Sequence, residues 1–401
     1  MNQGNGLSRK RIDDLITIYR DGLLEDTVPF WIRHSVDREQ GGFIFCLDRD
    51  GTILDTDKGM WIQSRFTWLL STLYAEVEAR PEWLELARHG LDFVERYGFD
   101  RDGKMFFQVT REGKPLRKRR YLATEGFAVI AYAAYGRAAG DERAIDRAFE
   151  MTRYMRGYAG SPAALSPKVI PDTRMIKSIG SNMMRIYISQ IMRQARPDPV
   201  CNEWIDEAIR EVRQDFIHDD KGWILEHVGP EGEFLDHFDG RMVNPGHLIE
   251  VAWFILHEAR VRDRDPDLIK LGCKMLDWAW EIGWDREYGG IFYFRDVNGL
   301  PCTEYYHDMK FWWPQNETII ATLLAYHLTG DPKYAKWHEQ LHDWVYSLFP
   351  DPEYGEWFGY FHRDGRLLNT IKGNLWKGPF HIPRMQLYAW KLLEEMREQT
   401  G

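Results

Sequence analysis

Two histidines stand where a side chain could do acid–base chemistry. His247 lies in the segment NPGHLIE (244–250), and His381 lies in GPFHIPR (378–384). Each follows a helix-breaking Pro or Gly and lies just inside the expected start of a helix. Imidazole has an unperturbed pKa of about 6.5, so one histidine can remove a proton from a carbon while the other returns one to the opposite face. The pair therefore predicts proton transfer beside a sugar carbonyl, through an enediolate, with His247 and His381 as the catalytic residues.

Six expected helix starts carry polar or aromatic side chains. Helices that are buried in the centre of a protein would be expected to carry aliphatic side chains at these positions. Bringing Arg, Glu, Asn, His and Gln to one rim would form a polar pocket with aromatic walls, the usual form of a substrate site. Besides the two histidines, the residues that we predict to bind substrate are Arg65, Glu125, Asn182, Glu250, Trp313, Gln315, Glu317 and Arg384.

Each of these side chains also has a structural alternative. Arg65 could pair with Glu125 across the bundle, and Asn182 could cap its helix. Gln315 and Glu317 could satisfy backbone groups near Pro314.

A metal site is not expected. His247 and Glu250, three residues apart, share a helix face, but the H-E-x-x-H pattern is absent and residue 251 is Val. Because no closed ligand set is visible from spacing, we predict chemistry without a metal or a required cofactor. We expect the remaining histidines to lie mostly on the surface or in loops.

An internal repeat sets the positions of these residues. A turn motif reads DREQGGF at 37–43, DREYGGI at 285–291 and DPEYGEW at 351–357, with weaker copies near 100 and 219. The spacing is about 60–66 residues, apart from one double gap, and this gap predicts a degenerate copy at 160–175. Asp-Gly or Asn-Gly shortly after each motif predicts a short β-hairpin.

Two amphipathic helical patterns lie between successive hairpins, and the links between helices alternate in length. Short links carry turn residues, and long links of about 20 residues carry the hairpins. This alternation predicts an all-α (α/α)6 barrel, formed by residues 1–401 as a single domain, with the long links on one face. The expected helices are 8–31, 60–78, 81–97, 121–138, 142–158, 176–194, 202–217, 245–260, 266–282, 308–329, 332–348 and 380–397.

Composition narrows the function classes. The net charge of −10 disfavours a nucleic-acid partner, and no long apolar run predicts a membrane span. The four cysteines are far apart and form no C-x-x-C pair, so we expect a reduced cytoplasmic protein. The 17 tryptophans exceed what packing needs and favour carbohydrate as the substrate, because aromatic rings stack on sugar faces.

At these residues the sequence resembles the N-acylglucosamine 2-epimerase family over nearly its whole length. The more specific matching segments are NPGHLIEVAWF (244–254), WDREYGGIFYF (284–294), KFWWPQNE (310–317), DPEYGEWFGYF (351–361) and KGNLWKGPFHIPR (372–384). The resemblance implies the same barrel, two essential histidines at 247 and 381, a substrate-contacting Arg65, and site carboxylates at Glu250, Glu125 and Glu317.

The resemblance also narrows the substrate. The segment GPFHIPR is typical of members that interconvert N-acetylglucosamine and N-acetylmannosamine, whereas cellobiose 2-epimerases usually have a Cys-Pro-Tyr-His-Asn type of segment. Aldose–ketose isomerisation of mannose and fructose, and epimerisation of cellobiose, are the alternatives within the family. Some members are modulated by ATP, for which the basic loop 111–120 is the candidate here, and members are often homodimers.

Two alternatives come from other classes. A glycoside hydrolase on the same barrel would need two carboxylates that flank a glycosidic oxygen, and Glu125, Glu250 and Glu317 could supply them. A non-catalytic carbohydrate- or protein-binding scaffold is the other, because fold alone does not fix function.

Overall fold

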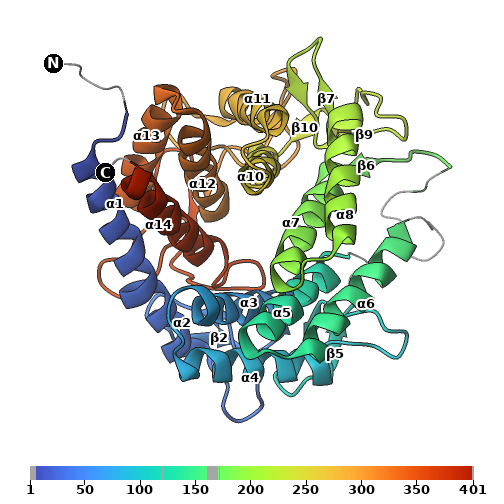
Figure 1. Ribbon diagram of the computed structural model, residues 1–401, viewed down its shortest axis with the longest axis vertical. Helices are drawn as coiled ribbons and strands as arrows, with labels where there is room; N and C mark the ends of the chain where they lie inside the picture. Colours follow the sequence, from blue (N-terminus) through green and yellow to red (C-terminus); the bar gives the residue numbers. More distant parts are fainter. Residues whose placement is uncertain (1–5, 119–121, 160–169, 171, 400–401) are drawn as a thin grey trace.

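The computed structural model describes residues 6–118, 122–159, 170 and 172–399. Its helices form two concentric rings (Figure 1). The inner ring contains helices that follow the long links: α3 (Met60–Glu76), α5 (Ala123–Ala139), α7 (Ile179–Ala195), α10 (Pro245–Val261), α12 (Trp312–Thr329) and α14 (His381–Gln399). The outer ring contains α1 (Arg9–Asp21), α4 (Pro81–Tyr97), α6 (Glu142–Ala159), α8 (Pro199–Glu211), α11 (Pro266–Gly283) and α13 (Pro332–Leu348). The predicted (α/α)6 barrel is therefore confirmed.

Burial explains which helix joins which ring. The inner helix α5 is buried without interruption from Thr124 to Gly136, and α12 is buried from Trp312 to Ala325. Outer helices such as α4 bury only one stripe, which includes Trp83, Leu86 and Leu91. A helix that is apolar on all sides must lie inside, whereas a one-sided helix can cover it.

The first and fourth outer helices differ from the prediction. The expected helix 8–31 contains a π-helical segment, η1 (Gly22–Thr27), and then continues as α2 (Val28–Ser35). Pro29 lacks the N–H that regular α-helical bonding would need here, which gives a local reason for the irregular turn. The expected helix 202–217 begins earlier, at Pro199, and ends in a second π-helical segment, η3 (Val212–Phe216).

The long links carry short strands, and a four-residue helix, α9 (Phe238–Arg241), interrupts one link. Hairpins form within single links, as predicted, between β1 (Cys46–Leu47) and β2 (Ile53–Asp55), β4 (Gln108–Val109) and β5 (Pro115–Arg117), and β7 (Ile217–His218) and β8 (Trp223–Ile224). Most of the degenerate copy predicted at 160–175 lies outside the described residues.

Strands also pair between neighbouring links, which the sequence did not indicate. The antiparallel pairs are β3 (Lys58–Gly59) with β4, β6 (Lys177–Ser178) with β9 (His227–Val228), β10 (Met242–Val243) with β11 (Arg295–Asp296), and β12 (Lys310–Phe311) with β13 (Tyr360–Phe361). A bridge between Leu47 and Gly373 connects the last link to the first. The links therefore form a hydrogen-bonded rim on one face of the barrel.

Three ion clusters, which we call clasps, tie this rim together, each with a buried aspartate and a buried lysine. In the first clasp, Oδ2 of Asp37 lies 2.8 Å from both Nζ of Lys58 and Nε of Arg111. The aspartate and lysine come from one link and the arginine from the next link around the ring. The other two clasps repeat this pattern: Asp285 with Lys310 and Arg363, and Asp351 with Lys372 and Arg49.

The clasps explain why the repeat motif begins with Asp. Asp37, Asp285 and Asp351 are the first residues of its three clearest copies, and all three are buried. The pKa of each carboxyl is held below its usual range, although burial opposes this, because an arginine and a lysine bind it. The third clasp joins the last link to the first and so closes the ring.

Candidate active site

His247 and His381 lie at the starts of two inner helices on the long-link face, as predicted. In α10, the backbone N–H of His247 donates to Oδ1 of the N-cap residue Asn244, over 3.2 Å. His381 is the first residue of α14 and is buried, whereas about one third of the His247 side chain is exposed. The two imidazoles are therefore held on rigid elements, and His247 has the more open side.

His247 is bound to a carboxylate that the sequence analysis missed. Its Nδ1 atom lies 2.8 Å from Oε1 of Glu226, a buried residue between β8 and β9. Burial disfavours the charged ring, but Glu226, and more weakly Glu250, outweigh it and raise the pKa of His247. His247 is therefore suited to carry a proton at neutral pH.

His381 has the opposite electrostatic environment. Its Nδ1 atom lies 2.6 Å from Oε1 of Glu317. Burial and the nearby guanidinium groups of Arg65 and Arg384 lower the pKa of His381 well below its usual value. This ring is therefore neutral at pH 7, and because Nδ1 faces a carboxylate, its Nε2 atom is the free basic nitrogen.

Trp313 connects the two histidines. Its ring centroid lies 5.0 Å from that of His247 and 5.7 Å from that of His381. Trp313 is mostly buried on α12, so it is a fixed aromatic wall against which both imidazoles pack. An aromatic wall beside both an acid and a base is a suitable surface for a sugar.

Arg65 places a positive charge beside this wall. Its guanidinium lies over the rings of Phe127 and Phe380, 4.0 and 4.5 Å from their centroids. Burial, and then the charge of Arg384, lower the pKa of Arg65 to about 9. Among the described residues no carboxylate forms an ion pair with Arg65, so the alternative pairing with Glu125 is wrong. A buried guanidinium without a counter-ion is suited to an anionic oxygen of a substrate.

Arg384 and two carboxylates form the floor of the site. The Nη2 atom of Arg384 lies 2.5 Å from Oε1 of Glu250 and 2.7 Å from Oε1 of Glu317. Trp253 donates from its indole nitrogen to the other oxygen of Glu317. Glu250, Glu317 and His381 lie close enough together to hold a metal ion, but the guanidinium of Arg384 already binds both carboxylates.

Two residues predicted to bind substrate also hold the links. Glu125 accepts a hydrogen bond from the backbone N–H of Met105, and Gln315 binds both backbone groups of Ile291. Gln63 does the same for Phe43, so this is a repeated feature of inner helix starts. These contacts give Glu125 and Gln315 a structural role, and their substrate roles stay predictions.

The buried Asn182 lies in the first turn of α7, where its Oδ1 atom binds Arg185. No hydrogen-bond partner of its Nδ2 atom is found among the described residues. Asn182 therefore keeps a free donor near the rim, although its contact is with its own helix and not with either histidine.

Glu226 had a signal in the repeat. Each link has a paired residue: Phe43, Met105, Ile224, Ile291 and Trp357. Two positions further on, the residue is Phe45, Phe107 and Tyr293 in three copies, Gly359 in a fourth and Glu226 in this one. A carboxylate at a position that is aromatic in three other copies marks a departure from packing. Aligning the copies residue by residue would have identified it.

One other sequence expectation is corrected here, for two of the remaining histidines. His338 and His342 on α13 are buried and contact the hydroxyl of Tyr19, so they are neither surface nor loop residues. In the basic loop 111–120, Arg111 pairs with Asp37 and Lys118 with Asp100, while Arg119 and Arg120 lie outside the described residues.

The barrel and its histidine pair define the class of the protein: an enzyme that isomerises sugars on an (α/α)6 scaffold. The family model of N-acylglucosamine 2-epimerase (GlcNAc 2-epimerase) matches residues 42–382, and the chain belongs to this family. It is accordingly a sugar epimerase.

Similarity to individual proteins supports this family assignment. The chain is 36% identical to N-acylglucosamine 2-epimerase of Bos taurus, with 93% of this chain and 90% of the relative covered. The corresponding protein of Mus musculus is 34% identical, over 90% and 88%. The structure of cellobiose 2-epimerase from Bacillus thermoamylovorans superimposes with a TM-score of 0.83 at 20% identity, over 94% of this chain and 99% of that one, which shows the shared fold. Among the described residues, no helix is long and apolar enough to cross a membrane.

Proposed function

We propose that this enzyme interconverts N-acetylglucosamine and N-acetylmannosamine by moving the proton at C2. The observation that carries this proposal is the pair of histidines that both pack against Trp313, each with Nδ1 fixed by its own carboxylate. Epimerisation needs a base on one face of C2 and an acid on the other, and the opposite pKa shifts of His381 and His247 supply both.

The reaction begins with the open-chain sugar, whose aldehyde makes the C2 proton acidic. The Nε2 atom of His381 takes this proton, and the electron pair of the broken C–H bond forms the C1–C2 double bond of an enolate. The protonated His247 then donates its Nε2 proton to the other face of C2, which restores the aldehyde with inverted configuration. After one turnover His381 is protonated and His247 is neutral, so the pair is set for the reverse reaction.

Arg65 is the residue best placed to stabilise the oxygen that becomes negative. Its guanidinium is buried and has no ion-pair partner among the described residues, so it can bind the oxyanion without first breaking another contact. Arg384 is bound by Glu250 and Glu317, and we assign it to holding the carboxylate that orients His381.

The substrate assignment is supported by sequence similarity. The relatives named N-acylglucosamine 2-epimerase are 32–36% identical over about nine tenths of the chain, whereas the matching cellobiose 2-epimerase structure is 20% identical. The hydrolase alternative is weakened because Glu125 binds a link, and because Glu250 and Glu317 bind one guanidinium and do not flank an open space.

The test is to incubate the protein separately with N-acetylmannosamine, mannose and cellobiose in heavy water and to separate the products. We expect N-acetylglucosamine with deuterium at C2. A ketose from mannose or an epimer of cellobiose as the main product would contradict the substrate assignment. Product without any solvent hydrogen at C2, and without internal return of the proton, would contradict the two-histidine mechanism.

Further properties follow only from the sequence and the family resemblance. A cytoplasmic location, a homodimer, independence of any required cofactor, and ATP modulation through the loop 111–120 stay predictions.

A further inference from the structure

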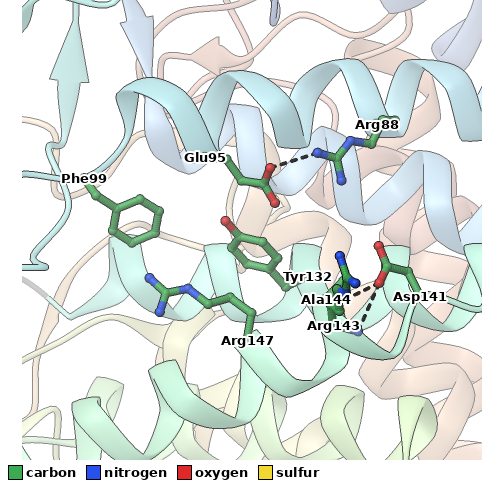
Figure 2. A pocket seen from close by; sticks show the side chains of 8 residues that line it. All are labelled: Arg88, Glu95, Phe99, Tyr132, Asp141, Arg143, Ala144 and Arg147. Atoms are coloured by element: carbon green, nitrogen blue, oxygen red, sulfur yellow. Dashed lines mark hydrogen bonds and ion pairs between the residues drawn. The ribbon is translucent and has the colours of Figure 1, made fainter.

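A second cavity lies outside the barrel, in a groove between the outer helices α4 and α6. Its volume is about 420 Å³, which is in the usual range for small-molecule sites. Figure 2 shows the side chains that line it, with Tyr132 of α5 at the centre and arginines from both outer helices around it. The lining residues are Arg88, Glu95, Phe99, Tyr132, Asp141, Arg143, Ala144 and Arg147.

Both carboxylates in the groove already have partners. Oε2 of Glu95 accepts from Nη2 of Arg88 over 2.8 Å. Oδ1 of Asp141 caps the start of α6 by accepting from the backbone N–H groups of Arg143 and Ala144. Two guanidinium groups, those of Arg143 and Arg147, are therefore left to define the charge of the open part of the groove.

The positions of these two arginines are electrostatically unfavourable without a ligand. They lie four residues apart on one face of α6, within its first two turns. Like charges at this spacing repel. Arg143 has no side-chain partner among the described residues, and the one ion pair of Arg147 among them is with the exposed Glu150 at 3.3 Å. An anion in the groove would relieve this repulsion.

Tyr132 adds a neutral donor at the floor. It is almost fully buried, and burial raises the pKa of its hydroxyl well above the usual value, so the O–H group stays protonated. Its hydroxyl lies toward the carboxylate of Glu95 (Figure 2) and also interacts with Arg147. Phe99, whose ring lies 5.4 Å from the guanidinium carbon of Arg147, gives the groove an apolar side.

We propose that this groove binds a small molecule that carries a phosphate group. The guanidiniums of Arg143 and Arg147 and the phenol of Tyr132 line the groove, and this set of donors favours a dianion over a carboxylate. The cavity is larger than phosphate alone, and its aromatic side leaves space for a sugar-like ring attached to the phosphate. The site is separate from the histidine pair and does not depend on the function proposed above.

Isothermal titration calorimetry at constant ionic strength tests this proposal. The probes are a hexose 6-phosphate, inorganic phosphate and the unphosphorylated hexose. We expect the double variant R143Q/R147Q to weaken binding of the phosphorylated probes by at least about tenfold. Tyr132→Phe, which removes one hydroxyl, should weaken it by a few fold. The control Arg210→Gln removes an exposed charge from another outer helix, α8, and should bind like the wild type.

The probes also separate the sources of the phosphate group. If inorganic phosphate and the hexose 6-phosphate bind equally tightly, the groove recognises the phosphate group alone. If the hexose 6-phosphate binds more tightly, the groove also contacts the sugar ring. The proposal is wrong if neither phosphorylated probe binds, or if R143Q/R147Q binds both as well as the wild type does. Matching thermal unfolding midpoints of the free proteins would show that the variants are folded.

Discussion

The Nδ1 atom of His381 lies 2.6 Å from Oε1 of Glu317, and the same oxygen lies 2.7 Å from Nη2 of Arg384. One carboxylate oxygen thus orients the imidazole and neutralises a neighbouring cation. Because that cation and Arg65 surround His381, Glu317 fixes its tautomer without making it permanently charged. At His247 the partner Glu226 acts with no comparable cation and promotes protonation.

The histidine pair is tested by His247→Asn and His381→Asn. Asparagine keeps some hydrogen bonding but has no titrating nitrogen, so each variant should lose at least about 10²-fold in turnover. Because the two residues act as a unit, the double variant should be little worse than the poorer single variant. Steady-state rates, with circular dichroism to verify folding, are the measurement. Wild-type rates in either single variant would exclude the two-base mechanism.

The pH profile of kcat/KM depends on the raised pKa of His247 and the lowered pKa of His381. The active form needs neutral His381 and protonated His247, so the rate should fall on the acid side well below pH 6.5 and on the alkaline side above it. Glu226→Gln removes the negative charge that raises the pKa of His247, so the alkaline limb should move to lower pH while the acid limb stays.

The matched control for this variant is Glu231→Gln, an exposed glutamate in the same link. Its profile should match the wild type. If Glu226→Gln lowers the rate equally at all pH values, Glu226 has a structural role only and does not tune the pKa of His247.

Chelation is expected to leave the rate unchanged. Glu250, Glu317 and His381 could surround a cation, but Nη2 of Arg384 already lies between the two carboxylates and supplies the positive charge. The measurement is turnover after prolonged treatment with a chelator, followed by addition of single divalent ions. A rate that disappears and returns with one specific ion would assign these residues to a metal.

The helices could be predicted from the sequence because their signals are local. The apolar period and the turn residues gave α4 and α13 their bounds, and α5 within two residues at each end. The clasps could not be predicted in this way, since Arg49 and Asp351 are 302 residues apart and no periodicity links them.

The site was predicted less completely. Both histidines, Arg65, Trp313 and Glu317 lie together as expected, whereas Glu125 and Gln315 point to the links. The helical pattern predicts the turn on which a polar residue lies. It does not predict whether the side chain will bind the substrate or the backbone of a neighbouring link. Gln63 shows that comparing equivalent positions among repeats would have resolved this for Gln315.

The clasp at the ring closure should be needed for stability. Asp351→Asn removes the charge that binds the fully buried Lys372, and we expect the free energy of unfolding at neutral pH to fall by about 3–5 kcal/mol. Because the folded-state pKa of Asp351 is depressed, its contribution is present above its unfolded pKa of about 4 and is lost as the pH falls below that value.

Urea denaturation at several pH values checks this prediction. Asp364→Asn, which changes an exposed aspartate of the same link, should have a much smaller effect. Equal stability of the wild type and Asp351→Asn at neutral pH would show that the clasp does not hold the ring.

Helix α1 lies against α14, and Asp13 near the start of the first forms an ion pair with Arg397 near the end of the second. These two helix ends therefore lie at the same face as the short connections between the other pairs, where a sixth short connection would fit (Figure 1). Once the third clasp has closed the rim, no helix pair is first or last in the packing. The position of the chain ends between α14 and α1 is therefore a property of the sequence order and is not required by the barrel. A circularly permuted chain, opened at Gly330 and joined between α14 and α1, should fold to the same ring with the same histidine pair.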